Sequence, residues 1–163
     1  MREIAIEKVV LSIGGVAEAL EKGYKLLSRM TNKTPSRRTS KKRIPSLNVR
    51  PGLEVGCLVT LRGKEAEEML KRLLQSIDNE LKEKQFSKNS FSFGIKEYIE
   101  IPGMEYDRDI GIRGFNVTVV FERPGVRVKK KKIKKGNLPK RHHVSKDEII
   151  KYMEENFKTQ IVK

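Results

Sequence analysis

The stretch Arg50-Pro-Gly-Leu-Glu-Val-Gly-Cys-Leu-Val-Thr-Leu-Arg-Gly63 decides the fold, because it predicts a turn, a strand and the start of a helix in succession. Its apolar residues alternate with period two, which is the pattern of a strand with one buried face. That face is expected to hold Val55, Cys57, Val59 and Leu61. The other face, with a hydroxyl and a charge, is expected to hold Gly56, Leu58, Thr60 and Arg62.

Similar patterns predict the other elements of the fold. Alternation indicates strands over residues 2–13, 91–101 and 115–121, and helical spacing indicates helices over residues 16–30 and 64–81. Residues 83–90 are expected to be a polar surface connection. Ser145 and Glu148 have the spacing of a capping box, which predicts a short final helix. The fold class is therefore α+β, with a mostly antiparallel sheet of about four to five strands, one side of which the helix over residues 16–30 is expected to cover.

The bulk composition favours a polyanionic partner. The 163 residues carry 36 Lys and Arg against 21 Asp and Glu, for a formal net charge of +15. We expect one domain, residues 1–163, and no apolar run is long enough to span a bilayer or to form a signal-peptide core. The protein is therefore expected to be soluble and intracellular. Cys57 is the single cysteine, and its place on the buried strand face predicts a packing role.

Two segments concentrate the positive charge. The basic loop, residues 33–53, has no Asp or Glu, and Pro45 and Pro51 argue against a helix, so we expect a long loop or a hairpin that contacts phosphates. The basic extension, residues 123–143, also lacks acidic residues and contains the run Lys129 to Lys132. Such a run, in a segment with Gly136 and Pro139, is not expected to pack on itself, so the extension is either solvated or an arm ordered by RNA.

Catalytic and metal chemistry have weak candidates. Glu105, Asp107 and Asp109 alternate as in a calcium loop, but Asn116 stands where the closing glutamate belongs. His142 and His143 lack a third nitrogen or sulfur ligand, so no metal site and no cofactor are expected. An RNA-processing or RNA-modifying enzyme using the same basic surface is the alternative function. A protein that binds acidic membranes is a further alternative, with little apolar anchoring beside the charges.

Four phrases of this sequence carry a resemblance to a known family: IEKVVLSIG (Ile6 to Gly14), NVRPGLEVGCLVTLRG (Asn48 to Gly63), FSFGIKEYIEIPGMEYDRDIGIRGFNVTVVF (Phe91 to Phe121) and RPGVRV (Arg123 to Val128). Over nearly the whole chain they resemble the L-five family of large-subunit ribosomal proteins, which bind 5S ribosomal RNA. The RPG segment, the basic extension and the final helix are similar to the archaeal and eukaryotic branch, and an archaeal source is expected.

The resemblance implies a two-layer α+β domain with the helices packed on one face of the sheet. It also implies a structural constituent of the large subunit in the cytoplasmic ribosome, and no enzyme. It implies that the sheet face opposite the helices is exposed for RNA and docks 5S ribosomal RNA in the central protuberance, through Ser12, Lys33 and Thr60. Bacterial members have asparagine at the position of Ser12 and glutamine at that of Lys33. The loop from Ser40 to Arg50 resembles one that reaches peptidyl-site transfer RNA, and the loop from Tyr106 to Arg113 one that faces the small-subunit head.

The implied partners are thus 5S ribosomal RNA, large-subunit ribosomal RNA, peptidyl-site transfer RNA and neighbouring ribosomal proteins, including those of the small-subunit head, and no membrane. Cations and hydroxyls suit phosphates and 2′-hydroxyls, so stacking on aromatic residues is expected to be minor. The residues expected to contact RNA are Ser12, Lys33, Arg37, Arg38, Thr39, Lys41, Lys42, Arg43, Asn48, Arg50, Thr60, Arg62, Lys129, Lys130, Lys131 and Lys132.

Overall fold

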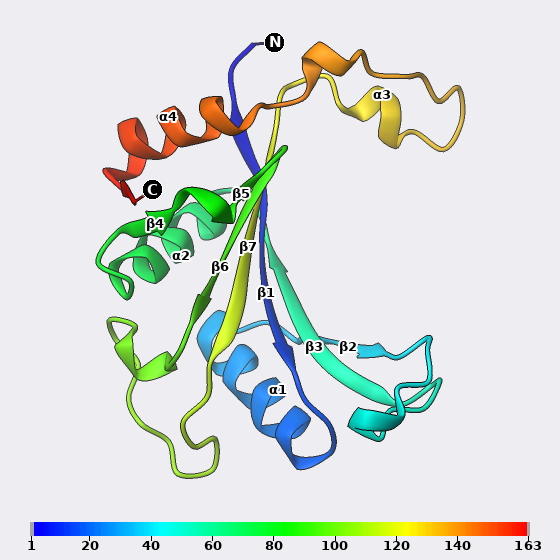
Figure 1. Cartoon of the computed structure of the whole chain (residues 1–163), viewed down its shortest axis with the longest axis vertical. Helices are drawn as coiled ribbons and strands as arrows, with labels where there is room; N and C mark the ends of the chain where they lie inside the picture. Colours follow the sequence, from blue (N-terminus) through cyan, green and yellow to red (C-terminus); the bar gives the residue numbers. More distant parts are fainter. Residues whose placement is uncertain (1, 163) are drawn as a thin grey trace. The chain divides into compact units, whose positions relative to one another are not determined.

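The structure is a computed structural model that describes residues 2–162. Short 3-10 turns at Pro45–Leu47, Glu83–Gln85, Tyr98–Glu100 and Lys140–His142 punctuate the chain. The helices and strands, in chain order (Figure 1), are β1 (Ala5–Gly14), α1 (Glu18–Thr31), β2 (Ser36–Thr39), β3 (Glu54–Leu61), α2 (Lys64–Gln75), β4 (Glu80–Lys82), β5 (Phe86–Ser87), β6 (Ser90–Ile95), β7 (Phe115–Glu122), α3 (Arg127–Lys130), α4 (Lys146–Phe157) and β8 (Gln160–Val162).

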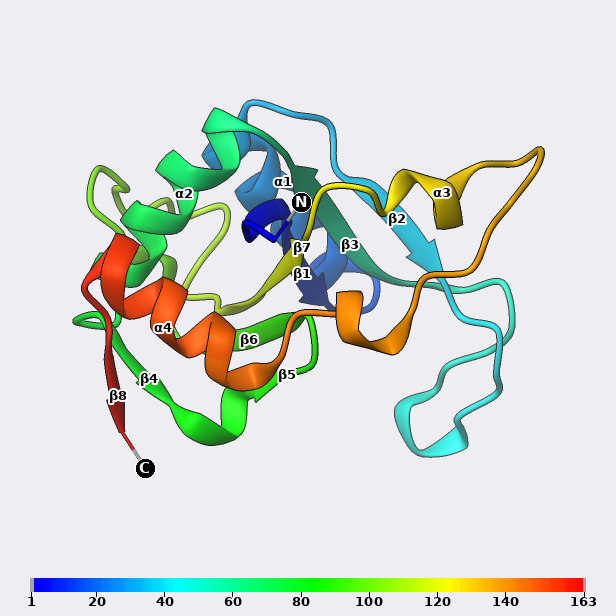
Figure 2. The same ribbon diagram turned by 90° about the horizontal axis from the view of Figure 1, so that it is seen from above.

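The main sheet has six strands in the order β2-β3-β1-β7-β6-β5. The edge pairs β2/β3 and β5/β6 are antiparallel. A separate two-stranded sheet pairs β4 with β8 in parallel, and Figure 2 shows these two strands side by side. The predicted α+β fold with a mostly antiparallel sheet is confirmed. The sheet exceeds the predicted four to five strands because β2 and β5 are short edge strands that lie in segments predicted to be a loop or connection.

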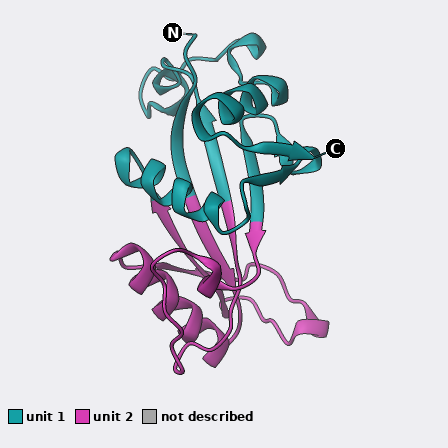
Figure 3. Cartoon of the chain, turned by 90° about the vertical axis from the view of Figure 1, so that its left-hand side faces the viewer, with its two compact units in different colours: residues 1–9, 61–93, 118–163 teal, residues 10–60, 94–117 magenta. Residues whose placement is uncertain are grey.

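The chain divides into two compact units, coloured separately in Figure 3. Unit 1 consists of residues 1–9, 61–93 and 118–163, and unit 2 of residues 10–60 and 94–117. Strands β1, β3, β6 and β7 each contribute residues to both units. The expectation of a single domain stays a prediction.

In unit 2, helix α1 packs against β1. A Cβ atom added to Gly23 of α1 would lie 2.8 Å from the Cγ2 atom of Ile13, so only glycine permits this close approach. The face of β1 that α1 covers is therefore the face of Ile13. Cys57 of β3 is buried, as predicted, and burial is the main cause that raises the pKa of its thiol.

In unit 1, an aromatic row connects the sheet to α4. The rings of Phe86 and Phe91 lie 5.2 Å apart, and Phe91 lies 5.8 Å from Phe121. Phe121 of β7 then meets Tyr152 of α4 edge-on at 5.5 Å. These spacings are those of favourable aromatic pairs. Buried Phe86 shows that the prediction of a polar surface connection over residues 83–90 was wrong, since one apolar residue in a polar segment gives no periodicity.

The second helix is shorter than predicted. Helix α2 ends at Gln75, and the predicted stripe residue Leu81 lies on β4 instead. Asp78 and Asn79 have φ angles of 53° and 58°, so a left-handed turn separates the helix from the strand. Leu81 is nevertheless buried, because β4 carries it into the core of unit 1.

The strand predicted over residues 91–101 also ends early, at Ile95. The Tyr98 N–H donates to the Arg113 carbonyl, and a short turn over Tyr98–Glu100 reverses the expected alternation. Tyr98 is fully buried while Ile99 is 37% exposed, the opposite of the predicted pattern. Contact with a distant loop, rather than local pattern, fixes this segment.

None of the described helices is long and apolar enough to cross a membrane.

Candidate nucleic-acid interface

Unit 2 presents a polar sheet face on the side away from α1. Ser12 lies between the buried residues Leu11 and Ile13, so its side chain is on the opposite face of β1. Thr60 of β3 alternates in the same way with Val59 and Leu61, and both hydroxyl-bearing residues are half-buried. Because β1 and β3 are neighbours in the sheet, the two hydroxyls share one face. Two of the residues that the resemblance assigns to contact with 5S ribosomal RNA therefore lie on adjacent strands and on the same face.

Strand β2 extends this polar face. Arg38 pairs with Gly56 of β3, and residues directly opposite each other place their side chains on the same face. Gly56 alternates with buried Cys57, so Arg38 is on the face of Thr60. Ser36 pairs with Leu58 and belongs to the same face. A hydroxyl-rich face bordered by a guanidinium can donate hydrogen bonds to phosphate and 2′-hydroxyl oxygens.

Arg37 points the other way. It pairs with Cys57, on the side that α1 covers. Its guanidinium lies 2.9 Å from Glu21 and 2.8 Å from Glu54, and 5.1 Å from the centre of the Tyr24 ring. The hydrogen bond to Glu54, then the charge of Glu21, raises the pKa of Arg37. This arginine was predicted to contact RNA, but its charge is already balanced within unit 2 and it ties β2 to α1.

The basic loop, residues 33–53, forms a hairpin, one of its two predicted forms. Beyond β2, the Ser40 N–H donates to the Leu53 carbonyl at 2.8 Å, and the Gly52 N–H donates to the Ser40 carbonyl at 2.9 Å. An isolated bridge pairs Ile44 with Val49, and Asn48 ends the tip with a φ of 53°. A hollow at the tip is lined by Arg43, Pro45, Asn48, Val49, Arg50 and Leu53.

The cations of this hairpin are mostly unpaired. Arg38, Lys41, Lys42, Arg43 and Arg50 are exposed and form no ion pair among residues 2–162. Thr39, at the end of β2, is exposed as well. Lys33 follows the C-cap of α1 at Asn32 and is exposed, within unit 2. All predicted contact residues from Ser12 to Thr60 therefore lie in one compact unit.

The remaining predicted contact residues lie in unit 1. Arg62 directly follows β3 and is exposed. In the lysine run, Lys129, Lys131 and Lys132 are exposed, but Lys130 bridges Glu7 of β1 and Glu122 of β7, with Nζ at 2.6 Å from each carboxylate. The hydrogen bonds to Glu122 and then Glu7 raise the pKa of Lys130. The run was expected to be either solvated or ordered by RNA, but Lys130 is held by two carboxylates on neighbouring strands of the same chain.

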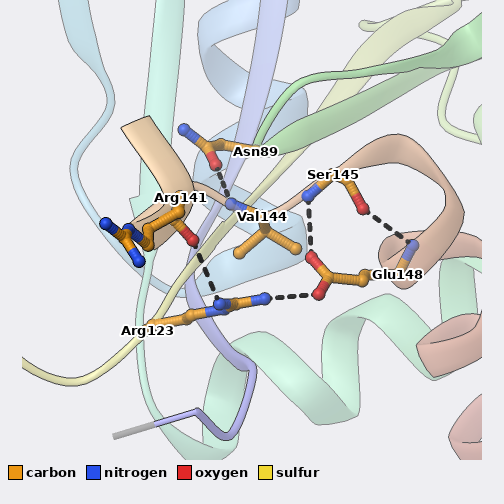
Figure 4. Close-up of polar contacts among 6 residues, drawn as sticks. All are labelled: Asn89, Arg123, Arg141, Val144, Ser145 and Glu148. Atoms are coloured by element: carbon orange, nitrogen blue, oxygen red, sulfur yellow. Dashed lines mark hydrogen bonds and ion pairs between the residues drawn. The ribbon is translucent and has the colours of Figure 1, made fainter. Parts of the chain in front are cut away.

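Side chains also fix the rest of the basic extension (Figure 4). Arg123 donates to Glu148 through Nη2 and to the carbonyl of Arg141 through Nη1. Glu148 accepts from the Ser145 N–H at 2.9 Å, while the Ser145 hydroxyl accepts from the Glu148 N–H at 3.4 Å, which confirms the predicted capping box. The backbone hydrogen bond from Ser145 is the main cause that lowers the pKa of Glu148.

Sequence reasoning missed Asn89, which holds the extension from the β5–β6 turn. Its Oδ1 atom accepts from the Val144 N–H at 2.6 Å, and its own N–H donates to the Val144 carbonyl at 3.2 Å. Its φ of 62° is one that asparagine tolerates better than most residues. The sequence signal was the polar Lys88-Asn89-Ser90 turn between two short phenylalanine-bearing segments.

The loop from Tyr106 to Arg113, in unit 2, is organised by Asp107. Its carboxylate accepts from Arg29 at 2.7 Å and from the Asp109 N–H at 2.9 Å, and its own N–H donates to the Tyr98 hydroxyl at 2.8 Å. Asp107 is thus occupied by the loop itself. Across residues 2–162, no three His, Cys, Asp or Glu side chains gather in a group that suits a metal ion.

Comparisons with known proteins match nearly the whole chain. The model for the C-terminus of the ribosomal L5 protein family matches residues 54–152. The large ribosomal subunit protein uL5 of Nanoarchaeum equitans is 44% identical over 165 residues, covering 99% of this chain and 98% of that protein. The protein of the same name from Methanobrevibacter smithii is 41% identical and covers 99% of this chain and 97% of that protein. The uL5 protein of Sulfurisphaera tokodaii, at 41% identity, covers 99% and 94% respectively.

Proposed function

This chain belongs to the ribosomal L5 family of large-subunit proteins, and from that premise we propose that it binds 5S ribosomal RNA through the polar sheet face of unit 2. Family membership makes it a non-enzymatic constituent of the ribosome in the cytoplasm, similar to archaeal relatives. Because the chain belongs to a family of structural ribosomal proteins, we do not retain the alternative of an RNA-processing enzyme.

The observation that carries the proposal is the shared face of Ser12, Thr60 and Arg38. Two hydroxyls and one guanidinium lie on adjacent strands of a rigid sheet. No carboxylate of β1, β2 or β3 lies on that face within unit 2, because a register shift beside Thr39 turns Glu54 to the side of Arg37. Structured RNA displays 2′-hydroxyls and phosphates over a wide shallow groove. A flat face with short donors fits that surface, so recognition follows backbone shape more than base edges.

The basic hairpin supports a second contact, with peptidyl-site transfer RNA. Its backbone hydrogen bonds hold Lys41, Lys42, Arg43 and Arg50 at an ordered tip, so cations meet a phosphate backbone with little loss of loop entropy. Exposed Tyr106 and Ile112, on the loop that Asp107 organises, suit a protein partner at the small-subunit head. Lys129, Lys131 and Lys132 provide contacts to large-subunit ribosomal RNA.

Nuclease footprinting on 5S ribosomal RNA tests the principal proposal. We expect the double variant Ser12→Ala, Thr60→Val to weaken binding about thirtyfold and to lose protection, because each of the two neutral hydrogen bonds contributes about 1 kcal/mol. The matched control is Ser28→Ala, which removes a half-buried hydroxyl from α1, on the covered side of the sheet. Unchanged protection by the double variant would remove this face from the binding site.

A further inference from the structure

Unit 1 contains a basic hollow outside every contact proposed above. Its walls come from the β5–β6 turn, the end of β7, the turn Lys140–His142 and the start of α4. The lining residues are Lys88, Arg123, Lys140, Arg141, His143, Val144, Ser145, Lys146 and Glu148. Glu148 is the single acidic residue among them. The hollow therefore collects cations from four segments.

Only some of these charges are balanced inside the chain. Arg123 is paired with Glu148, and Lys146 lies 2.6 Å from Glu83. Lys88, Lys140 and Arg141 form no ion pair among residues 2–162. Glu148 cannot serve them, because both of its carboxylate oxygens are already engaged, by Arg123 and by the Ser145 N–H. Three exposed cations thus remain around one concave surface.

The segment that carries them is fixed before any partner binds. Arg123 holds the carbonyl of Arg141, and Asn89 holds the N–H and carbonyl of Val144 (Figure 4). These bonds order residues that would otherwise separate through like-charge repulsion. Preorganisation of this kind lowers the entropy lost on binding, which is how a protein gains affinity for a charged ligand.

His143 lines the hollow, where both burial and nearby lysines disfavour the charged imidazole and lower its pKa. The Asn89 amide nitrogen lies 2.9 Å from His143 Nδ1, and since an amide NH2 can only donate, the imidazole accepts there and is neutral. Loss of solvation, followed by the charges of Lys88 and Lys129, lowers the pKa of His143. A bound anion would relieve this repulsion, whereas the free protein retains it.

We propose that this hollow binds a backbone phosphate of ribosomal RNA through Lys88, Lys140 and Arg141. The hollow is open and its cations come from separate segments, which suits a phosphodiester chain that continues beyond the site. The planar fork of Arg141 can bind two oxygens of one phosphate, while the two lysines act as point charges. The site shares no residue with the proposed 5S face, and it rests on the proposed function only in that the protein binds RNA.

The test compares two triple variants of the full chain with the same net charge. Lys88→Gln, Lys140→Gln, Arg141→Gln removes the three cations of the hollow. Lys71→Gln, Lys151→Gln, Lys158→Gln removes three exposed cations elsewhere in unit 1. Filter binding to 5S ribosomal RNA and to large-subunit ribosomal RNA is measured over a range of salt concentrations. Thermal unfolding verifies that both variants remain folded, as expected when no ion pair is removed from the hollow.

We expect the hollow variant to reduce the slope of log K against log salt by roughly 0.7 to 0.9 on one of the two RNAs, as for one phosphate contact. The control variant should leave the slope nearly unchanged. Equal slopes for both variants on both RNAs would overturn the proposal, as would saturable binding of inorganic phosphate at the hollow without any change in RNA slope. Loss of footprint in the Ser12, Thr60 variant is independent of this result, so the two proposals fail separately.

Discussion

The basic loop in unit 2 and the basic extension in unit 1 have similar compositions but are ordered in different ways. The loop pairs its backbone with β3 and with itself, so its side chains are left to project. The extension relies on side chains instead, since Asn89, Arg123 and Lys130 each bind it to a strand or a strand end. A cation of the basic loop is therefore available to bind RNA unless strand alternation turns it toward α1, as at Arg37. A cation of the basic extension is available to bind RNA unless a carboxylate of the same chain holds it.

The largest expected effect is at Asn89, whose side chain holds the basic extension in place. We expect Asn89→Ala to lower the free energy of unfolding by about 3 kcal/mol, because it leaves the buried Val144 N–H without its partner and places alanine at positive φ. Asn89→Gly loses the same hydrogen bonds without the strain, so it should cost about 1 kcal/mol less. Urea unfolding measures both. Equal losses would show that backbone strain plays no part, and negligible losses would show that the extension is not held here.

The ion pair at Glu148 should show a defined pH dependence. The pKa of Glu148 is lowered in the folded protein, so its contribution is present above the unfolded value near 4.3 and is lost as the pH falls through the folded value. We expect Glu148→Gln to cost about 1 kcal/mol at pH 7, a modest value because the carboxylate is partly exposed, and less at an acidic pH where the folded carboxylate becomes protonated. Glu155→Gln, on the exposed side of α4, is the control for urea unfolding at both pH values. A cost independent of pH would contradict the assignment.

Within the basic loop, we expect substitutions of the adjacent residues Arg37 and Arg38 to have different effects. Arg38→Gln is expected to weaken RNA binding about three- to fivefold near physiological salt and to reduce the salt slope by roughly 0.7 to 0.9, as for one phosphate contact. Arg37→Gln should leave the slope unchanged and reduce stability only slightly, since its ion pairs are exposed. Filter binding and thermal unfolding of both variants provide the measurements. If Arg37→Gln lost the same slope as Arg38→Gln, the assignment of faces would be wrong.

The smallest effects are expected in the lysine run. Lys130→Gln should change the salt slope little and lower stability by less than about 1 kcal/mol, because its carboxylate partners lie on a partly exposed surface. Lys131→Gln removes an exposed charge and should lower the slope by roughly 0.7 to 0.9 with no loss of stability. The same two assays separate these outcomes. The reverse pattern would mean that Lys130 leaves its carboxylates to bind RNA.

Local pattern predicted those features that neighbouring residues decide. The alternation of Val59, Thr60 and Leu61 predicted both the buried face of β3 and its polar face, since successive side chains of a strand must point to opposite sides. The spacing of Ser145 and Glu148 predicted the capping box for a similar reason, because the two residues are fixed by a single helical turn. The burial of Cys57 followed from the same register.

Features fixed by distant contacts could not be found in this way. Tyr98 is buried because the loop at Arg113 and Asp107 reaches it, and no local pattern contains that information. Phe86 and Asn89 were missed because two residues of strand and one turn give no period to detect. If the pairing of residues 36–39 with β3 had been known, strand alternation would have placed Arg37 and Arg38 on opposite faces of the sheet.

Local patterns in the sequence predicted a basic α+β protein whose strand over residues 54–61 has one buried and one polar face, and four phrases of the sequence indicated its family. The folded structure was needed to show which cations have carboxylate partners. Alternation and charge density are properties of the local chain, whereas neutralisation depends on the carboxylates that folding brings near. Glu21 reaches Arg37, and Glu7 reaches Lys130, because the strands and helices that carry them are adjacent in space and distant in sequence.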